Sequence, residues 1–336
     1  MMELTDPRGP LSEWVVSQLR GRPGHPVTPA EQVPGGADAL RSDDLHLALY
    51  LCYELSYGGI EGVNDRWEWD PALLSFRAAL EAPFESALQT AAASAPAVAA
   101  GAIDARLRDV LRADDGPALS RFLEREGTPA HYREFLMHRS AYQLKEADPH
   151  SFGIPRIEGR AKAALVEIQA DEYGGGDPAW MHSALFARSM RALGLDHRPG
   201  AYVDNLPGTT LAWVNLVSLF GLHRRLRGAL VGHLAAFEMT SCIPNRRYAD
   251  GLRRLGFGAD AVAYFDEHVE ADAVHESVAA NDLAGGLVAQ EPHLEADVLF
   301  GARALLVTEA AFASRLLQAW EAGRSSLLRD PISTAA

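Results

Sequence analysis

The sequence runs Asp266-Glu-His-Val-Glu-Ala-Asp-Ala-Val-His275 within a segment whose apolar spacing predicts a helix. A helix turns roughly 100° per residue, so His268, Asp272 and His275 fall within about 60° of one another on one face. Two imidazoles and a carboxylate suit a divalent ion such as Fe(II), Mn(II) or Zn(II). The alternative is a solvated helix face, because glutamates lie beside these residues.

Apolar residues recur at helical spacing from Asp43 onward. No stretch of useful length shows the period-2 alternation and β-branched residues that are typical of a strand, so the sequence predicts an all-α fold. Residues 21–41 are an exception, because their prolines and glycines cannot propagate a helix and indicate an extended arm. The further helices that the spacing predicts cover residues 71–95, 101–112, 116–126, 208–222, 224–241, 259–284 and 292–322.

Three short motifs predict where helices begin and end. Thr128-Pro129 supplies an N-cap and a first-turn proline, whose missing N–H is not needed there. The glycines at 174–176 end the preceding helix. Asp177-Pro178 repeats the capping pattern directly after them, so we expect another helix to begin there. Two helices would then meet at a glycine-rich break.

A second group of candidate ligands lies around this break. Glu172 precedes the glycines, and His182 follows it ten residues later. An acid near a helix C-terminus opposes the macrodipole, and a bound cation would compensate its charge. Carboxylates also bridge metal ions, because their two oxygens can bind separate cations. Glu146 and Asp148, at the end of the previous helix, each offer a third carboxylate. The alternative is that all four are ordinary residues at helix ends.

Composition limits the partners that the protein can have. Lys and Arg number 31 and Asp and Glu 45, so the formal net charge of the 336 residues is −14. An acidic surface repels phosphate backbones and anionic lipids, and we expect neither nucleic acid nor a membrane as partner. The best apolar run, residues 211–222, is shorter than the roughly 20 residues of a membrane span. With no signal peptide and no paired cysteine motif, the sequence predicts a cytoplasmic protein.

Taken together, the candidate ligands resemble those of the haem-oxygenase-like diiron oxidases, a family of iron-containing redox enzymes. The order Glu, Glu, His, His, Asp, His and the spacings of 26, 10, 86, 4 and 3 residues are similar to that family's. The resemblance covers residues 128 to about 322. It implies a six-residue metal ligand set: Glu146, Glu172, His182, His268, Asp272 and His275.

The resemblance also implies an architecture. Residues 128–325 are expected to form a haem-oxygenase-like bundle of about seven helices, with two iron ions held between them. Residues 1–127 resemble the N-terminal helical extension of an actinobacterial-type subgroup. They are expected to form an arm and a helical extension, either as a separate part or as one domain with the bundle. A homodimer is compatible with such an arm, although no residue argues for it directly.

The activity that the resemblance implies is that of a non-haem diiron oxidase or oxygenase. Two Fe(II) ions would reduce O2, the co-substrate, to a bridged peroxo-diferric species. Family members use such oxidants to oxygenate amines and guanidines, to cleave amino acids or to form alkenes from fatty acids. We therefore expect a small-molecule substrate with an amine, amino-acid or carboxylate group. An external electron donor is compatible with this chemistry.

Two other classes of protein stay open. A haem-binding protein of the same fold would need a proximal histidine on the first helix of the bundle, where His131 and His138 lie. That alternative does not explain why His268, Asp272 and His275 share one face of a helix. A non-catalytic helical metal-binding or scaffold protein would carry these residues on its surface. Ferritin-like iron storage is disfavoured, because none of the twelve histidines has a glutamate three residues before it.

Three residues outside the ligand set are candidates to support the site or to bind substrate. Glu238 lies in an otherwise apolar segment, where it supports a ligand, faces the substrate or forms a buried salt bridge. Arg246 and Arg247 follow it in the sequence. Guanidinium groups bind carboxylates with two hydrogen bonds, so this pair would suit an acidic substrate, unless it only ends a helix in solvent.

Overall fold

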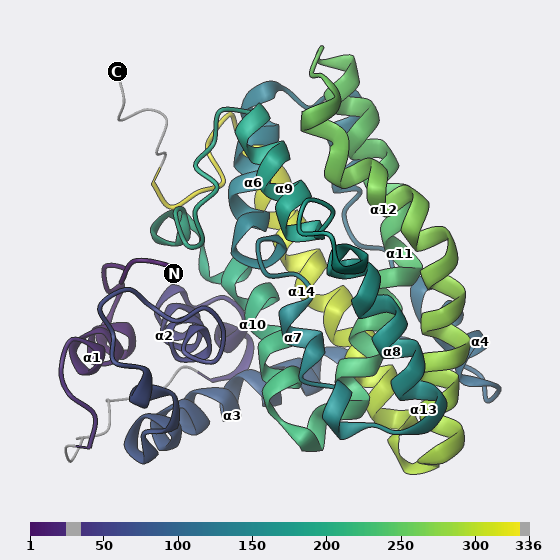
Figure 1. Ribbon diagram of the computed structural model, residues 1–336, viewed down its shortest axis with the longest axis horizontal. Coiled ribbons are helices and arrows are strands. Elements are labelled where there is room, and N and C mark those ends of the chain that lie inside the picture. The colour runs from purple at the N-terminus through teal and green to yellow at the C-terminus, as the bar shows by residue number, and fades with distance from the viewer. Residues whose placement is uncertain (25–34, 330–336) are drawn as a thin grey trace.

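The computed structural model describes residues 1–24 and 35–329, and helices make up its regular structure (Figure 1). The described residues contain no β-strand, only an isolated bridge between Met2 and Ile60. The predicted all-α fold is confirmed. The α-helices are α1 (Pro10–Leu19), α2 (Asp43–Glu54), α3 (Pro71–Ala93), α4 (Ile103–Arg112), α5 (Leu119–Arg125), α6 (Pro129–Gln143), α7 (Asp148–Ser151), α8 (Gly159–Glu172), α9 (His182–Ala192), α10 (Gly208–Leu222), α11 (Arg227–Arg254), α12 (Ala259–Ser277), α13 (Gly285–Gln290) and α14 (Glu295–Glu321).

Two long helices, α11 and α14, pack closely against each other within the bundle (Figure 1). Gly232 of α11 lies against the carbonyl of Val298, and Gly301 of α14 lies against the carbonyl of Ala229. A side chain at either glycine would collide with the backbone of the other helix, so these glycines set how closely the two helices approach. On its other side α11 packs along α12, which also contacts α9. These contacts bring the helices of the candidate ligands next to one another.

The N-terminal helices pack on the bundle. Helices α1 to α3 lie on one flank, beside α10, while α4 lies on the opposite side (Figure 1). Helix α2 packs against α10, and both α3 and α4 contact α14. Leu49 and Leu80 belong to the same hydrophobic cluster as Leu216 and Leu305 of the bundle. The division of the chain near residue 127 stays a prediction.

The capping predictions had two different outcomes. Helix α6 begins at Pro129, and the Thr128 hydroxyl accepts a hydrogen bond of 3.3 Å from the His131 amide, as the sequence predicts. After the glycines 174–176, all of which have positive φ, no helix begins at Asp177-Pro178. The Asp177 side chain instead accepts from the Ala179 amide at 2.9 Å and closes a turn. Helix α9 therefore begins at His182, which places this candidate ligand in its first turn.

Helices α11 and α12 also differ from the prediction. The sequence predicts an end near residue 241, but α11 continues through Pro244 to Arg254. Residues 245, 248, 249 and 252 are buried at helical spacing, and this burial outweighs the proline. Helix α12 ends at Ser277, and a π-helical turn, Val278–Ala284, follows it. A π-turn adds one residue to a helical turn, so it changes which side chains face inward after it.

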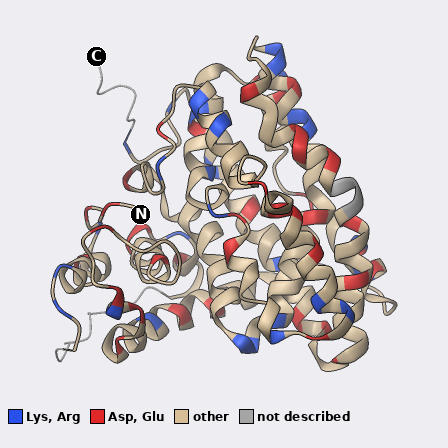
Figure 2. Ribbon diagram, viewed as in Figure 1, with Lys and Arg blue, Asp and Glu red and all other residues tan. Residues whose placement is uncertain are grey.

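Charged residues are spread over the molecule. Figure 2 shows basic and acidic residues interspersed along the helices of the described chain. None of the helices among the described residues is long and apolar enough to cross a membrane.

Candidate metal centre

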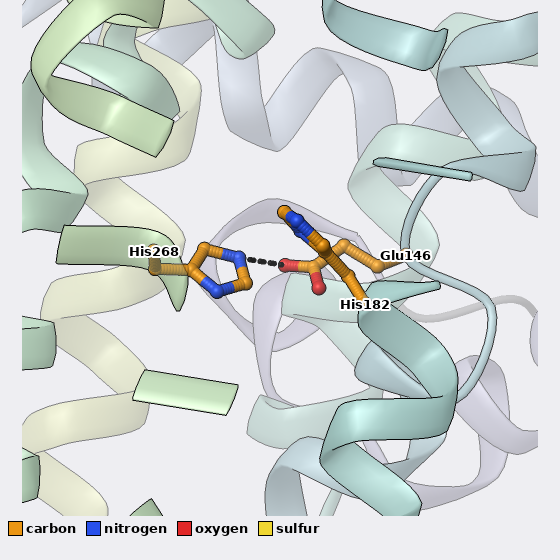
Figure 3. A group of neighbouring side chains, drawn as sticks. All are labelled: Glu146, His182 and His268. Atoms are coloured by element: carbon orange, nitrogen blue, oxygen red, sulfur yellow. Dashed lines mark ion pairs between the residues drawn. The ribbon is translucent and has the colours of Figure 1, made fainter. Parts of the chain in front are cut away.

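Three predicted ligands meet in the interior of the bundle. Glu146 lies in the turn between α6 and α7, His182 is the first residue of α9, and His268 lies in the middle of α12. Their potential ligand atoms all lie within 4.8 Å of one another. Figure 3 shows the His268 imidazole facing the Glu146 carboxylate, with His182 beside it. All three side chains are buried, with exposed fractions of 4% or less.

The hydrogen bonds around His268 leave one of its ring nitrogens directed at the cluster. Its Nδ1 donates to the carbonyl of Tyr264, one helical turn earlier, at 2.8 Å. Its Nε2 lies 3.7 Å from Glu146 Oε1. A metal-binding histidine usually donates its second N–H to a carbonyl or carboxylate, which fixes the ring and its tautomer. The backbone contact therefore directs Nε2 toward the cluster, the orientation that a metal ligand would need.

Tyr264 also holds the carboxylate of Glu146. Its hydroxyl lies 2.8 Å from both oxygens of that carboxylate and donates to them. Burial raises the pKa of Glu146, but the neighbouring His268 and the Tyr264 hydrogen bond outweigh burial and leave that pKa below its usual value. Glu146 is therefore ionised at neutral pH. Tyr264 was not identified in the sequence, although its position four residues before His268 is a signal that could have found it.

Glu172 and His182 lie side by side. Glu172 ends α8, and its Oε2 is 2.9 Å from His182 Nδ1. Both atoms are buried, and the contact between them is an ion pair without a hydrogen bond. Burial lowers the pKa of His182, but the charge of Glu172 outweighs it and the net shift is upward. His182 belongs both to this pair and to the three-residue cluster, so Glu172 lies directly beside that cluster.

His275, the last candidate ligand on α12, has neighbours outside the three-residue cluster. His275 is buried, and its Nε2 lies 2.9 Å from the Asp171 carboxylate. Its Nδ1 lies 3.5 Å from Glu238 and has no hydrogen-bond partner. Burial lowers the pKa of His275, but Glu238 and Asp171 raise it to about 9. The side chain of Asp272 lies outside the described residues, so its role as a ligand stays a prediction.

The residues present fit a divalent metal ion. Three buried carboxylates, Glu146, Glu172 and Glu238, each lie against a histidine in the described structure. Three buried atoms of this group, Glu172 Oε2, His182 Nδ1 and His275 Nδ1, have no hydrogen bond. Buried charges and unpartnered polar atoms destabilise a fold unless a partner compensates them. A cation with mixed nitrogen and oxygen ligands would compensate them, and iron has this preference.

A cavity of about 220 Å3 adjoins the cluster. Tyr264 belongs to both, since it hydrogen-bonds Glu146 and also lines the cavity. Much of the wall is aromatic, and the residues involved are Phe135, Phe186, Phe237, Phe265 and Tyr248.

The arginines that the sequence analysis singled out lie elsewhere. Arg246 is exposed, and Arg247 lies near Glu124, at 3.8 Å, and Ser120. Neither lines the cavity, although Asn245 does. The structure instead places Arg139, from α6, in the cavity wall. Arg139 precedes Gln143 and Glu146 at helical spacing, a signal that the search for ligands did not use.

The two histidines considered for haem binding have other contacts. Both ring nitrogens of His138 lie within hydrogen-bond distance of hydroxyls, 2.8 Å from Thr210 and 2.9 Å from Ser326. His131 accepts from the Thr128 amide at 3.3 Å and stacks on Trp320 with ring centroids 4.7 Å apart. A proximal ligand needs a free imidazole nitrogen directed into an open pocket, and His138 does not offer one.

The chain is similar to a family of known proteins. Residues 133–310, more than half of the chain, match the family described as iron-containing redox enzymes. The nitrosourea synthase of Streptomyces achromogenes subsp. streptozoticus is 31% identical over 147 residues, which are 43% of this chain and 31% of that enzyme. The chain thus matches about a third of the length of that relative.

A solved structure is similar in fold. The CADD-like protein of unknown function from Nostoc punctiforme PCC 73102 is 18% identical, with a TM-score of 0.50, over 64% of this chain and 96% of that one. The family match spans the cluster Glu146, His182 and His268 as well as Glu172 and His275. On these grounds the chain belongs to the family of iron-containing redox enzymes.

Proposed function

We propose that this protein is a diiron, O2-dependent oxidase or oxygenase that acts on a small substrate with an amine, amino-acid or carboxylate group. The observation that carries the proposal is the buried group of imidazoles and carboxylates beside a cavity large enough for a small molecule. The relative named nitrosourea synthase and the family of iron-containing redox enzymes support it.

Six residues would hold the two iron ions. Glu146, His182 and His268 are already together and would hold one ion. Glu172 lies beside His182, and we assign it, with Asp272 and His275, to the completion of the site. Bound iron supplies the one-electron steps with O2 that protein side chains do not perform, and the remaining electrons come from the substrate or an external donor.

The protein's own residues position the reactants. Tyr264 holds Glu146 in one orientation and stands between the cluster and the cavity. Burial raises the pKa of Tyr264 well above its usual value, and Glu146 raises it further, so its hydroxyl keeps its proton. The hydroxyl therefore continues to donate this proton to the Glu146 carboxylate. The aromatic side chains give the space that the substrate would occupy a largely apolar wall.

The test is an anaerobic titration of the metal-free protein with Fe(II), followed by admission of O2. We expect two iron ions per chain and a transient absorption band that needs O2. His268→Ala is the matched variant and should bind less iron, because it removes one imidazole from the cluster. Binding of one iron or none, with no O2-dependent band, would overturn the proposal. Iron binding without any reaction with O2 would favour a non-catalytic metal-binding protein.

A further inference from the structure

A buried glutamine links the cavity to the three-residue cluster. Gln143, the last residue of α6, lines the cavity and is only 5% exposed. Its side chain hydrogen-bonds the Tyr264 hydroxyl, and that hydroxyl lies 2.8 Å from both oxygens of the Glu146 carboxylate. A continuous chain of hydrogen bonds therefore runs from the cavity wall to a predicted iron ligand.

The Tyr264 hydroxyl decides which end of the Gln143 amide faces it. A phenol has one proton, and Tyr264 donates this proton to the ionised Glu146 carboxylate. The hydroxyl oxygen can then only accept, so the Gln143 amide faces it with an N–H group. The other end of the amide, Oε1, is a buried acceptor without a hydrogen-bond partner. A buried acceptor of this kind destabilises the fold unless a donor reaches it.

Other polar residues of the wall already use hydrogen-bond donors within the protein. The Thr240 hydroxyl donates to a backbone carbonyl of its own helix at 2.7 Å, which leaves its oxygen as an acceptor. Arg139, the one arginine among the described lining residues, hydrogen-bonds Glu309 and Tyr248. Gln143 and Thr240 therefore both favour a ligand that supplies a hydrogen-bond donor.

The donor that suits Gln143 belongs to a neutral group. Gln143 itself is uncharged, and much of the wall is aromatic. A charged group placed here would lose its hydration without gaining an opposite charge from the amide. A neutral amide would bring its own carbonyl, for which the wall would have to supply a further donor. A hydroxyl supplies one neutral donor and meets neither difficulty.

We propose that Gln143 is a positioning and specificity-determining residue: its Oε1 accepts a hydrogen bond from a neutral ligand hydroxyl, while its N–H holds Tyr264 in the orientation that fixes Glu146. The inference rests on the proposed function and adds a neutral hydroxyl to the substrate groups named there. A donor on Oε1 restricts the amide to one orientation and strengthens the whole hydrogen-bond chain. Ligand binding and metal binding are then coupled, and each tightens the other by the same factor.

The test compares phenol with toluene, in which a methyl group of similar size replaces the hydroxyl. Their binding to the full-length, metal-free protein is measured by calorimetry. The phenol preference is the ratio of the two affinities, and comparing it between variants cancels the different hydration of the two probes. Gln143→Met removes the amide at similar side-chain length. It should lower the phenol preference about two- to tenfold, the value of one neutral hydrogen bond.

Gln169→Met is the matched control. Gln169 is also a buried glutamine whose Oε1 has no hydrogen-bond partner, but it does not line the cavity. The control should leave the phenol preference unchanged. A merely structural role for Gln143 would lower the affinities for phenol and toluene together and would not change their ratio.

A second measurement needs no substitution at Gln143. Saturating phenol should tighten Zn(II) binding to the metal-free protein about fivefold or more, whereas toluene, which lacks the donor, should not. Tyr264→Phe removes the hydroxyl between Gln143 and Glu146 and should abolish this effect. An effect that survives in Tyr264→Phe would indicate direct contact between phenol and the ion and would overturn the coupling. Equal effects of phenol and toluene would also overturn it.

The other outcomes concern the ligand itself. A phenol preference that Gln143→Met leaves unchanged, or that Gln169→Met lowers equally, would overturn the role of Gln143. The absence of phenol binding in the millimolar range would overturn it too. If iron and O2 behave as proposed while the phenol preference is missing, only this inference fails. If the preference holds while iron does not bind, the diiron proposal fails and the hydroxyl site at Gln143 stands.

Discussion

Replacing Tyr264 with phenylalanine should weaken iron binding without unfolding the protein. The substitution removes one hydroxyl, which lies 2.8 Å from each oxygen of the Glu146 carboxylate. The ring itself remains, with its contacts to Phe186 and His268 at centroid distances of 5.0 Å and 4.2 Å. The change therefore affects Glu146, one predicted ligand, together with the contact of the hydroxyl with Gln143.

The size of the effect follows from that hydrogen bond. A hydrogen bond to a charged group contributes about 1.5–3 kcal/mol, which corresponds to a factor of about 10 to 100 in an equilibrium constant. Loss of a group that hydrogen-bonds a metal ligand typically lowers metal affinity by about 10- to 100-fold. The hydroxyl has a single proton to share between the two Glu146 oxygens, so we count one hydrogen bond and expect this range.

The assay is the anaerobic Fe(II) titration, with the circular dichroism spectrum as a check on folding. Tyr248→Phe is the control, because Tyr248 lines the same cavity and is also buried but does not contact the cluster. It should bind iron as the unmodified protein does. An iron affinity of Tyr264→Phe within about twofold of that of the unmodified protein would be a smaller change than the loss of this hydrogen bond predicts. That result would show that Tyr264 does not position Glu146 in the iron-loaded protein.

Three further predictions concern the ligands and the packing of the fold. His268→Ala should keep the helical circular dichroism spectrum but lose iron from at least one position, and a full iron complement would refute its assignment. Burial lowers the pKa of His275, but Glu238 outweighs burial and raises that pKa to about 9. Because this pKa is above the usual value of about 6.5, the pair stabilises the fold fully below about pH 6.5. This stabilisation is lost as the pH rises through 9. Glu238→Gln should therefore lower the Tm of the metal-free protein at pH 6 more than at pH 10, and an equal loss at both would contradict the pairing. Gly232→Ala should destabilise the fold by about 1–3 kcal/mol in urea unfolding through its clash with α14, whereas Gly258→Ala, which has open space around it, should change little.

Local patterns in the sequence predicted several helices and their ends. Helical periodicity identified α10 at its observed bounds, and the Thr128-Pro129 cap identified the start of α6. These features depend on residues close together in the chain, which share a helix or a turn. The ligand stripe on α12 was predicted in the same way, because its spacing of four and three residues fits the helical period.

Features that depend on distant residues were not predicted. Helix α11 continues through Pro244 because its far half is buried against other helices. Tyr264 was not predicted because its role depends on a hydrogen bond to Glu146, which lies 118 residues earlier. Arg139 and Glu309 are 170 residues apart, and nothing local to either indicates that they pair in a cavity wall.

The sequence by itself therefore determined the helical class, most helix boundaries and the residue types that can bind iron, because these properties arise within one or two turns of a helix. Only the tertiary structure decided which of those residues meet. It joined Glu146, His182 and His268 in one buried cluster, and it placed beside them a cavity whose wall includes Asp114 and residues 116–120. The physical reason is that a cavity and a cluster consist of distances between helices, which are set by packing across the whole chain.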